Sequence, residues 1–189
     1  MNGKLVIISA PSGSGKTTII SYILKQGLNL QFAVSATSRK PRGREQHGVE
    51  YYFISQQEFI DKIARGEFLE YEEVYPGLFY GTLKSEINRI FSLNGNVIFD
   101  VDVAGGCSIK NHYKDQALSI FIQPPSIVEL KRRLENRGTE DPAMIEKRLI
   151  RAKEELEFAA QFDKIIVNDD LSVAKKLTLT TVKNFLDSI

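Results

Sequence analysis

The segment APSGSGKTT, residues 10–18, follows the apolar run KLVIIS (4–9) and determines how the fold is interpreted. It fits the pattern G-x-x-x-x-G-K-[ST], except that Ala10 takes the place of the first glycine. A methyl group is tolerated at that position if φ is negative. Gly13 and Gly15 stand where the backbone approaches phosphate oxygens, so that successive N–H groups and the start of the next helix form an anion site.

Two side chains of this segment complete the chemistry of a nucleotide site. Lys16 would place a point charge near the β- and γ-phosphate oxygens, and the Thr17 hydroxyl would ligate Mg²⁺. The alternative is a plain Gly/Ser turn, but the strand before it and the helix expected over 16–26 favour a nucleoside triphosphate site. The expected triphosphate-binding residues here are Ala10, Pro11, Ser12, Gly13, Ser14, Gly15, Lys16, Thr17 and Thr18.

The composition is that of an ordinary soluble protein. The chain has 189 residues, 42% of them hydrophobic and 26% charged, which suits one domain with a real core. A net charge of +1 requires any anion site to be a local cluster, and the single Cys107 excludes an intramolecular disulfide. Because no signal peptide or membrane-spanning stretch is visible, we expect a cytoplasmic protein that binds neither membranes nor nucleic acid.

Short apolar runs alternate with longer amphipathic stretches along the chain. Continuous apolar strands separated by helices are typical of a parallel sheet covered on both faces. The predicted buried strands lie at 4–9, 96–101, 117–122 and 164–168. Helix starts are predicted from Ser55 with Glu58, from Ser126 with Glu129, and from Asp141 followed by Pro142. The sequence thus predicts an α/β fold, with a last helix at 171–188.

Two intervals depart from this alternation and are interpreted as attachments to the core. Residues 34–84 are rich in Arg, Tyr and Gly and form a small inserted lobe of mixed α and β structure. Residues 126–160 form two charged helices with more arginines than solubility requires. The core is then 1–33, 85–125 and 161–189, all within one domain.

The inserted lobe contains a basic cluster, SRKPRGRE, that includes Arg39 and Arg42. A solvated loop is one interpretation. The nearby Tyr51, Tyr52 and Tyr80 favour the other, a phosphate site, because a tyrosine hydroxyl beside an arginine fork commonly grips phosphate.

Glu70 lies among apolar and aromatic residues in FLEYEE. A carboxylate that is unpaired in such surroundings is costly. We therefore expect the donor-rich edge of a ligand to satisfy it.

Seven segments, in this order and spacing, resemble guanylate kinases over about residues 4–180. They are APSGSGKTT, SATSRKPRGRE…GVEYYF, FLEY, FYGT, VIFDVD, RLENRGTE and KIIVNDD. The resemblance implies a Mg²⁺-dependent transfer of a phosphoryl group from ATP to GMP, giving ADP and GDP. It also implies a P-loop core with a five-stranded parallel sheet, a GMP-binding lobe at 34–84 and a helical lid at 126–160.

The resemblance assigns the GMP-binding residues. Those implied are Ser35, Arg39, Arg42, Tyr51, Glu70, Tyr80, Thr82 and Asp102. A carboxylate at Glu70 accepts from guanine N1–H and the 2-amino group together, whereas adenine has no such pair of donors. The hydroxyls of Ser35 and Thr82 donate to guanine O6, and Arg39, Arg42, Tyr51 and Tyr80 hold the phosphate. Asp102 lies on the GMP side, near the base.

The resemblance also assigns the residues that act on ATP. Asp100, at the end of VIFDVD, is the acid that holds Mg²⁺ together with Thr17. Arg133 binds ATP from the lid, and Asn168 contacts adenine. The residues implied to be catalytic are Lys16, Arg39, Arg137 and Arg148.

Two alternatives stay open at this stage. The first is a non-catalytic guanylate-kinase-like module that binds phosphorylated protein segments; the intact Lys16-Thr17 pair argues against it. The second is a kinase for another small phosphorylated substrate; Ser35 and Glu70 argue against it. No obligatory protein partner is expected, and no chemistry is assigned to Cys107, His47 or His112.

Overall fold

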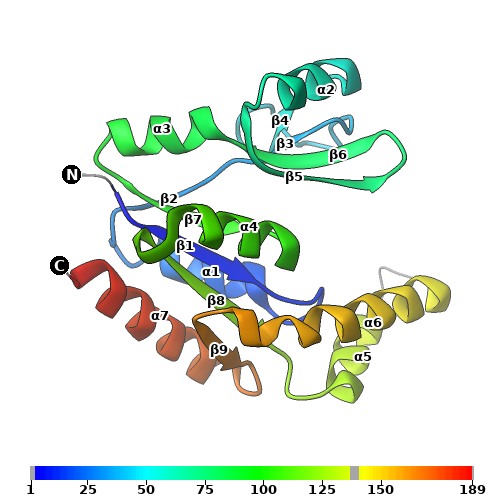
Figure 1. Cartoon of the computed structure of the whole chain (residues 1–189). Helices are drawn as coiled ribbons and strands as arrows, with labels where there is room; N and C mark the ends of the chain where they lie inside the picture. Colours follow the sequence, from blue (N-terminus) through cyan, green and yellow to red (C-terminus); the bar gives the residue numbers. More distant parts are fainter. Residues whose placement is uncertain (1–2, 137–140, 189) are drawn as a thin grey trace. The chain divides into compact units, whose positions relative to one another are not determined.

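The computed structural model describes residues 3–136 and 141–188 (Figure 1). They form an α/β fold with a five-stranded sheet in the order β2-β7-β1-β8-β9, in which β1 pairs in parallel with β8 and β8 with β9. This confirms the predicted fold class. The strands are β1 (Leu5–Ser9), β2 (Leu30–Phe32), β7 (Asn96–Asp100), β8 (Ala117–Gln123) and β9 (Lys164–Val167).

The described residues divide into two compact units. The inserted unit contains Gly3 and Leu30–Val97, and the P-loop unit contains the described residues of Lys4–Asn29 and Ile98–Ile189. The helices of the P-loop unit are α1 (Lys16–Leu24), α4 (Val103–Tyr113), η1 (Lys114–Gln116), α5 (Ile127–Asn136), α6 (Pro142–Glu157), η2 (Ala159–Gln161) and α7 (Leu171–Asp187).

Strands β1 and β8 are buried because helices cover the sheet. Strand β9, at the edge of the sheet, exposes Ile165 and Val167, so the prediction that residues 164–168 form a buried strand is wrong in its burial. Leu5, Val6, Ile7 and Ile8 of β1 each have 0% exposure, as expected of a strand covered on both faces. Helices α5 and α6 share a small core of their own, made of Leu130, Leu134, Ile145, Leu149 and Ala152. The two helices of the predicted lid therefore pack against each other (Figure 1).

The predicted helix starts are confirmed by their capping bonds. The Ser55 hydroxyl accepts from the Glu58 N–H at 3.1 Å, and the Ser126 hydroxyl accepts from the Glu129 N–H at 3.0 Å. The Asp141 carboxylate caps α6, which begins at Pro142. Such caps satisfy N–H groups that have no partner within the helix.

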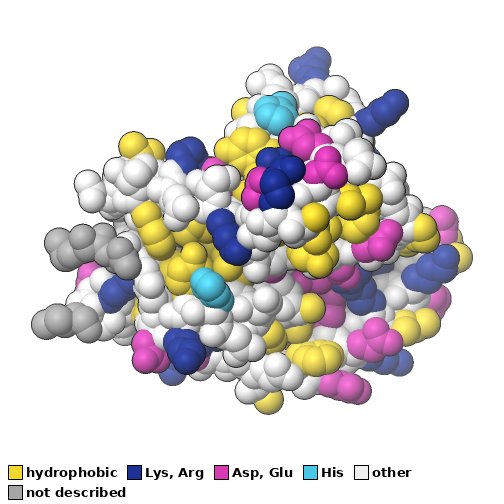
Figure 2. All heavy atoms as spheres, turned by 45° about the horizontal axis from the view of Figure 1, so that its top comes forward, with side chains coloured by type: hydrophobic (Ala, Val, Ile, Leu, Met, Phe, Trp, Pro, Cys, Tyr) yellow, Lys and Arg dark blue, Asp and Glu magenta, His cyan; other side chains and the backbone are white. Residues whose placement is uncertain are grey.

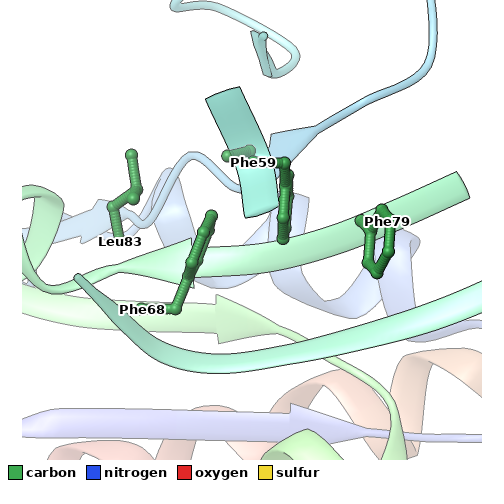
Figure 3. Packing of buried hydrophobic residues seen from close by; sticks show 5 residues of the cluster. Phe59, Phe68, Phe79 and Leu83 are labelled. Atoms are coloured by element: carbon green, nitrogen blue, oxygen red, sulfur yellow. The ribbon is translucent and has the colours of Figure 1, made fainter. Parts of the chain in front are cut away.

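The inserted unit has its own four-stranded sheet in the order β4-β3-β6-β5. Its elements after β2 are β3 (Ala36–Thr37), β4 (Tyr52–Phe53), α2 (Gln56–Ala64), β5 (Phe68–Tyr75), β6 (Leu78–Leu83) and α3 (Lys84–Ser92). Phe59 of α2 stacks on Phe68 with a centroid distance of 4.2 Å and lies 5.2 Å from Phe79 (Figure 3). This aromatic cluster fixes the helix on the sheet that carries the candidate GMP residues.

The surface agrees with the near-neutral net charge. Acidic and basic side chains are interspersed on the face shown in Figure 2. Within residues 3–136 and 141–188, no helix is both long and apolar enough to span a membrane.

Candidate functional site

The predicted phosphate-binding loop lies between β1 and α1 and is closed by backbone bonds. The Ser14 N–H donates to the Pro11 carbonyl at 3.0 Å, and Gly13 and Gly15 have φ of 97° and 89°. The positive φ explains both glycines, because L residues with side chains rarely adopt it. The described non-glycine residues with positive φ are Asn29, Asn94 and Lys114, so Ala10 fits the loop with an ordinary φ.

Packing around the loop gives a second reason for these glycines. A Cβ on Gly13 would lie 2.9 Å from a methyl carbon of Leu130 in α5. A Cβ on Gly15 would lie 2.4 Å from the side-chain nitrogen of Asn168. The glycines therefore serve the fit of the loop to its neighbours, in addition to the phosphate approach that the sequence predicts.

The buried side chain of Asn168 is hydrogen-bonded to the loop. It is 3% exposed, and its side-chain amide donates to the Ser14 carbonyl at 2.7 Å. Its Oδ1 is buried with no hydrogen-bond partner in the described part of the chain. Asn168 thus holds the loop in place, a structural role that was not predicted from the sequence.

Lys16 and Asp100 bring opposite charges together at the start of α1. Lys16 Nζ forms an ion pair with the Asp100 carboxylate and donates to the Val101 carbonyl at 3.2 Å. Thr17, the next residue, is exposed. A carboxylate and a hydroxyl are oxygen ligands suited to Mg²⁺, which usually binds through one or two carboxylates, phosphates and several waters. The described residues include no group of three His, Cys, Asp or Glu that could cage a metal, and such an ion needs none.

Two of the predicted lid arginines belong to the described part of the P-loop unit. Arg148 of α6 donates to the hydroxyl of Ser12 in the phosphate-binding loop. Arg133 of α5 donates to Glu129 at 2.8 Å and to the Asp169 carbonyl at 3.4 Å. The third, Arg137, lies outside the described residues.

The Asp102 carboxylate accepts hydrogen bonds from two other residues of the P-loop unit. One carboxylate oxygen caps α4 by accepting from the Gly105 N–H at 2.8 Å, and the other accepts from Arg151 at 3.4 Å. Arg151 also pairs with Glu155 at 2.9 Å. Burial raises the pKa of Glu155, against the opposing effect of Arg151. These contacts do not test the predicted role of Asp102 beside guanine.

Arg39 is the centre of the side-chain cluster in the inserted unit. Its Nε donates to the Tyr80 hydroxyl at 3.1 Å, and its guanidinium carbon lies 5.3 Å from the centre of the Tyr51 ring. Tyr51 and Tyr80 meet edge to face, with ring centroids 5.7 Å apart. Three of the four predicted phosphate-binding residues are therefore in one group, while the Arg42 side chain is exposed.

Glu45 belongs to this cluster and was missed in the sequence analysis. It accepts from both Nη atoms of Arg39, at 2.7 and 3.0 Å, and from the Arg42 N–H at 2.7 Å. The hydrogen bonds from Arg39 lower the pKa of Glu45 to about 2. The available signal was an acid six residues after Arg39 in an otherwise basic loop.

Three residues predicted to read guanine come from neighbouring positions of the inserted sheet: Glu70 in β5, Thr82 in β6 and Ser35 just before β3. Glu70 of β5 is directly opposite Thr82 of β6, so both side chains point to the same face. Thr82 is 0% exposed, and its hydroxyl has no hydrogen-bond partner among the residues that the structure describes. Ser35 directly precedes Ala36, which pairs with Gly81, the residue before Thr82. An orphaned buried hydroxyl opposite a carboxylate fits a ligand with both an acceptor and donors on one edge.

Fold and loop together define a class of protein: a P-loop α/β nucleotide-binding protein. Comparison with known proteins specifies the family. The guanylate kinase family model matches residues 2–188. The chain therefore belongs to the guanylate kinase family, which confirms the resemblance found in the sequence.

Similar proteins agree over nearly the whole chain. A guanylate kinase from Bacteroides thetaiotaomicron is 58% identical over 99% of this chain and 92% of its own length. One from Porphyromonas gingivalis is 53% identical over 97% of this chain and 98% of its own. The crystal structure of guanylate kinase from Anaplasma phagocytophilum aligns with a TM-score of 0.77 at 26% identity, covering 99% of this chain and 88% of that one.

Proposed function

We propose that this protein transfers the γ-phosphoryl group of ATP to GMP, producing ADP and GDP. The observation that carries the choice of GMP is the pairing of Glu70 with Thr82 across β5 and β6. The carboxylate accepts from guanine N1–H and the 2-amino group, and the buried Thr82 hydroxyl donates to O6. Adenine offers neither this pair of donors to Glu70 nor an acceptor at position 6 to Thr82, and a missing partner of this kind discriminates by up to about 10⁴–10⁵-fold.

The phosphate of GMP is assigned to the Arg39 cluster. The Arg39 guanidinium and the hydroxyls of Tyr51 and Tyr80 are the donors, with Arg42 completing the site. Since Glu45 already holds the fork of Arg39, GMP phosphate would bind an arginine whose orientation is set in advance. We assign residues 34–84 to the GMP-binding lobe on these grounds.

ATP is assigned to the loop of residues 10–18. Its backbone N–H groups and Lys16 would hold the triphosphate, with Asn168 near adenine and Arg133 and Arg148 from the lid at 126–160. Thr17 and Asp100 would hold Mg²⁺, which when bound neutralises phosphate charge. Phosphoryl transfer needs little covalent chemistry from the protein, so these side chains act by positioning the phosphates and neutralising their charge.

The test is release of ADP from ATP in the presence of GMP, AMP, CMP or UMP, measured with a coupled assay. We expect turnover with GMP at least 100-fold above that with the other three, on the order expected for hydrogen-bond readout. Equal turnover with AMP would overturn the assignment of guanine to Glu70. Binding of a phosphorylated peptide with no turnover of any monophosphate would instead indicate an interaction module.

A further inference from the structure

Glu86 of α3 is a buried carboxylate outside the site described so far. It is 2% exposed and accepts four hydrogen bonds. Oε1 accepts from the Val34 N–H at 3.2 Å and from Arg89 Nη2 at 2.9 Å. Oε2 accepts from the Tyr52 hydroxyl at 2.9 Å and from Arg89 Nε at 2.9 Å.

A buried carboxylate such as that of Glu86 is costly unless it is paired and hydrogen-bonded. Burial by itself would raise the pKa of Glu86, but the hydrogen bonds from Arg89, Val34 and Tyr52 keep that pKa below its usual value. The side chain of Arg89 is 46% exposed and the side chain of Glu86 only 1%, so only the carboxylate loses its water. A buried ion pair is weak support for stability, because desolvation cancels much of the attraction.

The partners of Glu86 suggest what it does. Val34 directly precedes Ser35, and Tyr52 directly follows Tyr51. Residues 33–35 lie between β2 and β3 and belong to neither strand, and Val34 is buried. Its N–H therefore needs an acceptor from outside a strand ladder, and Glu86 supplies one. The Tyr52 N–H also donates to the Ser35 carbonyl at 2.9 Å, which joins the two segments directly.

We propose that Glu86 is a positioning residue for GMP, holding the backbone next to Ser35 and strand β4, which directly follows Tyr51, in a fixed arrangement. This inference rests on the proposed function. One carboxylate thereby sets the distance between a residue assigned to guanine and a residue assigned to phosphate. Arg89 donates two hydrogen bonds to the carboxylate and thereby keeps it charged and oriented.

The experiment compares Glu86→Gln with the wild-type protein. A glutamine has one acceptor oxygen, and its NH₂ group would face donors on Arg89 and Tyr52. We expect the KM for GMP to rise about tenfold, equivalent to roughly one lost hydrogen bond, while kcat and the KM for ATP stay within about twofold. Glu67→Gln is the matched control, since Glu67 of the same unit pairs with Lys62 and Arg65.

A second variant separates positioning from general stability. Tyr52→Phe removes one donor to Glu86 and leaves the aromatic ring, so we expect the KM for GMP to rise about threefold, a fraction of one hydrogen bond. If both changes act through the same bond, the double variant has a GMP KM below the product of the two separate effects. A merely structural role would lower thermal stability without this coupling in KM.

The outcomes are distinguishable. A folded Glu86→Gln protein whose GMP KM equals that of Glu67→Gln would overturn the inference. If Glu86→Gln does not fold, Tyr52→Phe decides, and an unchanged KM overturns the inference in the same way. Wild-type protein that does not phosphorylate GMP would overturn the proposed function itself, and this role with it.

Discussion

The P-loop unit and the inserted unit carry their candidate anion sites on different kinds of scaffold. In the P-loop unit, one continuous segment, residues 10–18, presents its backbone N–H groups in a loop shaped by Gly13 and Gly15. In the inserted unit, the side chains of Glu45 and Tyr51, which lie outside the strands, and of Tyr80 in β6 converge on Arg39. A site made of backbone depends on local conformation, whereas a site made of side chains depends on the packing of distant segments.

The two units share one feature, which is that a carboxylate holds the principal cation. Lys16 pairs with Asp100, and Arg39 pairs with Glu45. The difference lies in the cation, since Lys16 is a compact point charge and Arg39 a planar fork. Substitutions at these positions therefore test whether the two sites work independently and by different means.

The largest effect is expected in the P-loop unit. Lys16→Met keeps the length of the side chain and removes the charge, so kcat should fall on the order of 10²–10³-fold, as for other lost electrostatic stabilisers. Binding of GMP, measured by calorimetry, should stay within about twofold, because every residue assigned to guanine but Asp102 lies in the inserted unit. Lys25→Met, at the exposed end of α1, is the control. A large loss of GMP binding in Lys16→Met would contradict this independence.

The next effect concerns the reading of guanine. Glu70→Gln puts an NH₂ donor where the base presents donors, which costs about 1–3 kcal/mol, or roughly 5–150-fold in GMP affinity. ATP binding should not change. Glu73→Gln, an exposed residue of the same strand, controls for the loss of a negative charge. If GMP titrates identically into both variants, Glu70 does not contact the base.

The sequence predicted the local geometry of the loop in the P-loop unit better than the side-chain contacts of the inserted unit, for a physical reason. The loop, its flanking strand and helix, and Lys16 are contiguous, so their spacing alone indicates their geometry. Glu45 was missed because its role appears only when the loop folds back on Arg39. Glu86 was missed because it lies 52 positions from Val34, whose N–H it accepts.

Packing also adds to the explanation of two residues that were singled out in the sequence. Gly13 and Gly15 were expected to admit a phosphate, and the structure adds close neighbours at Leu130 and Asn168. Those neighbours lie more than a hundred residues away, and no local pattern in the sequence indicates them. The fold class was predictable because continuous apolar strands require a sheet that is covered on both faces.

A smaller effect tests the fork of Arg39. Arg39→Lys keeps the charge but cannot bind a carboxylate or phosphate with two parallel N–H groups, so GMP affinity should fall about tenfold. Arg132→Lys is a closely matched control, because Arg132 also binds a glutamate through Nε and Nη2, at 2.7 and 2.8 Å, on an exposed face of α5. Equal GMP affinities in the two variants, measured by calorimetry, would remove Arg39 from the phosphate site.

The smallest effect concerns acid stability and the pair of Arg39 with Glu45. The pKa of Glu45 is lowered from 4.5 to about 2 in the folded protein, chiefly by hydrogen bonds from Arg39. Between these two values the unfolded chain binds a proton that the folded protein does not, so stability falls as the pH falls. The contribution of the pair is fully present above about pH 4.5 and is lost progressively as the pH decreases to about 2.

Thermal unfolding of the wild-type protein and Glu45→Gln, followed from pH 6 to about pH 2, measures this contribution. The difference in Tm between the two proteins should be greatest near pH 6 and shrink as Glu45 is protonated. The acid loss from other carboxylates, such as Glu129 with its pKa of about 2, is common to both proteins and cancels in the difference. Gln46→Ala, an exposed change in the same loop that adds and removes no titrating group, should keep the wild-type slope. A Tm difference that is constant across the range would mean that Arg39 is held by its tyrosines rather than by Glu45, and the side-chain site would then be pre-oriented by aromatic packing alone.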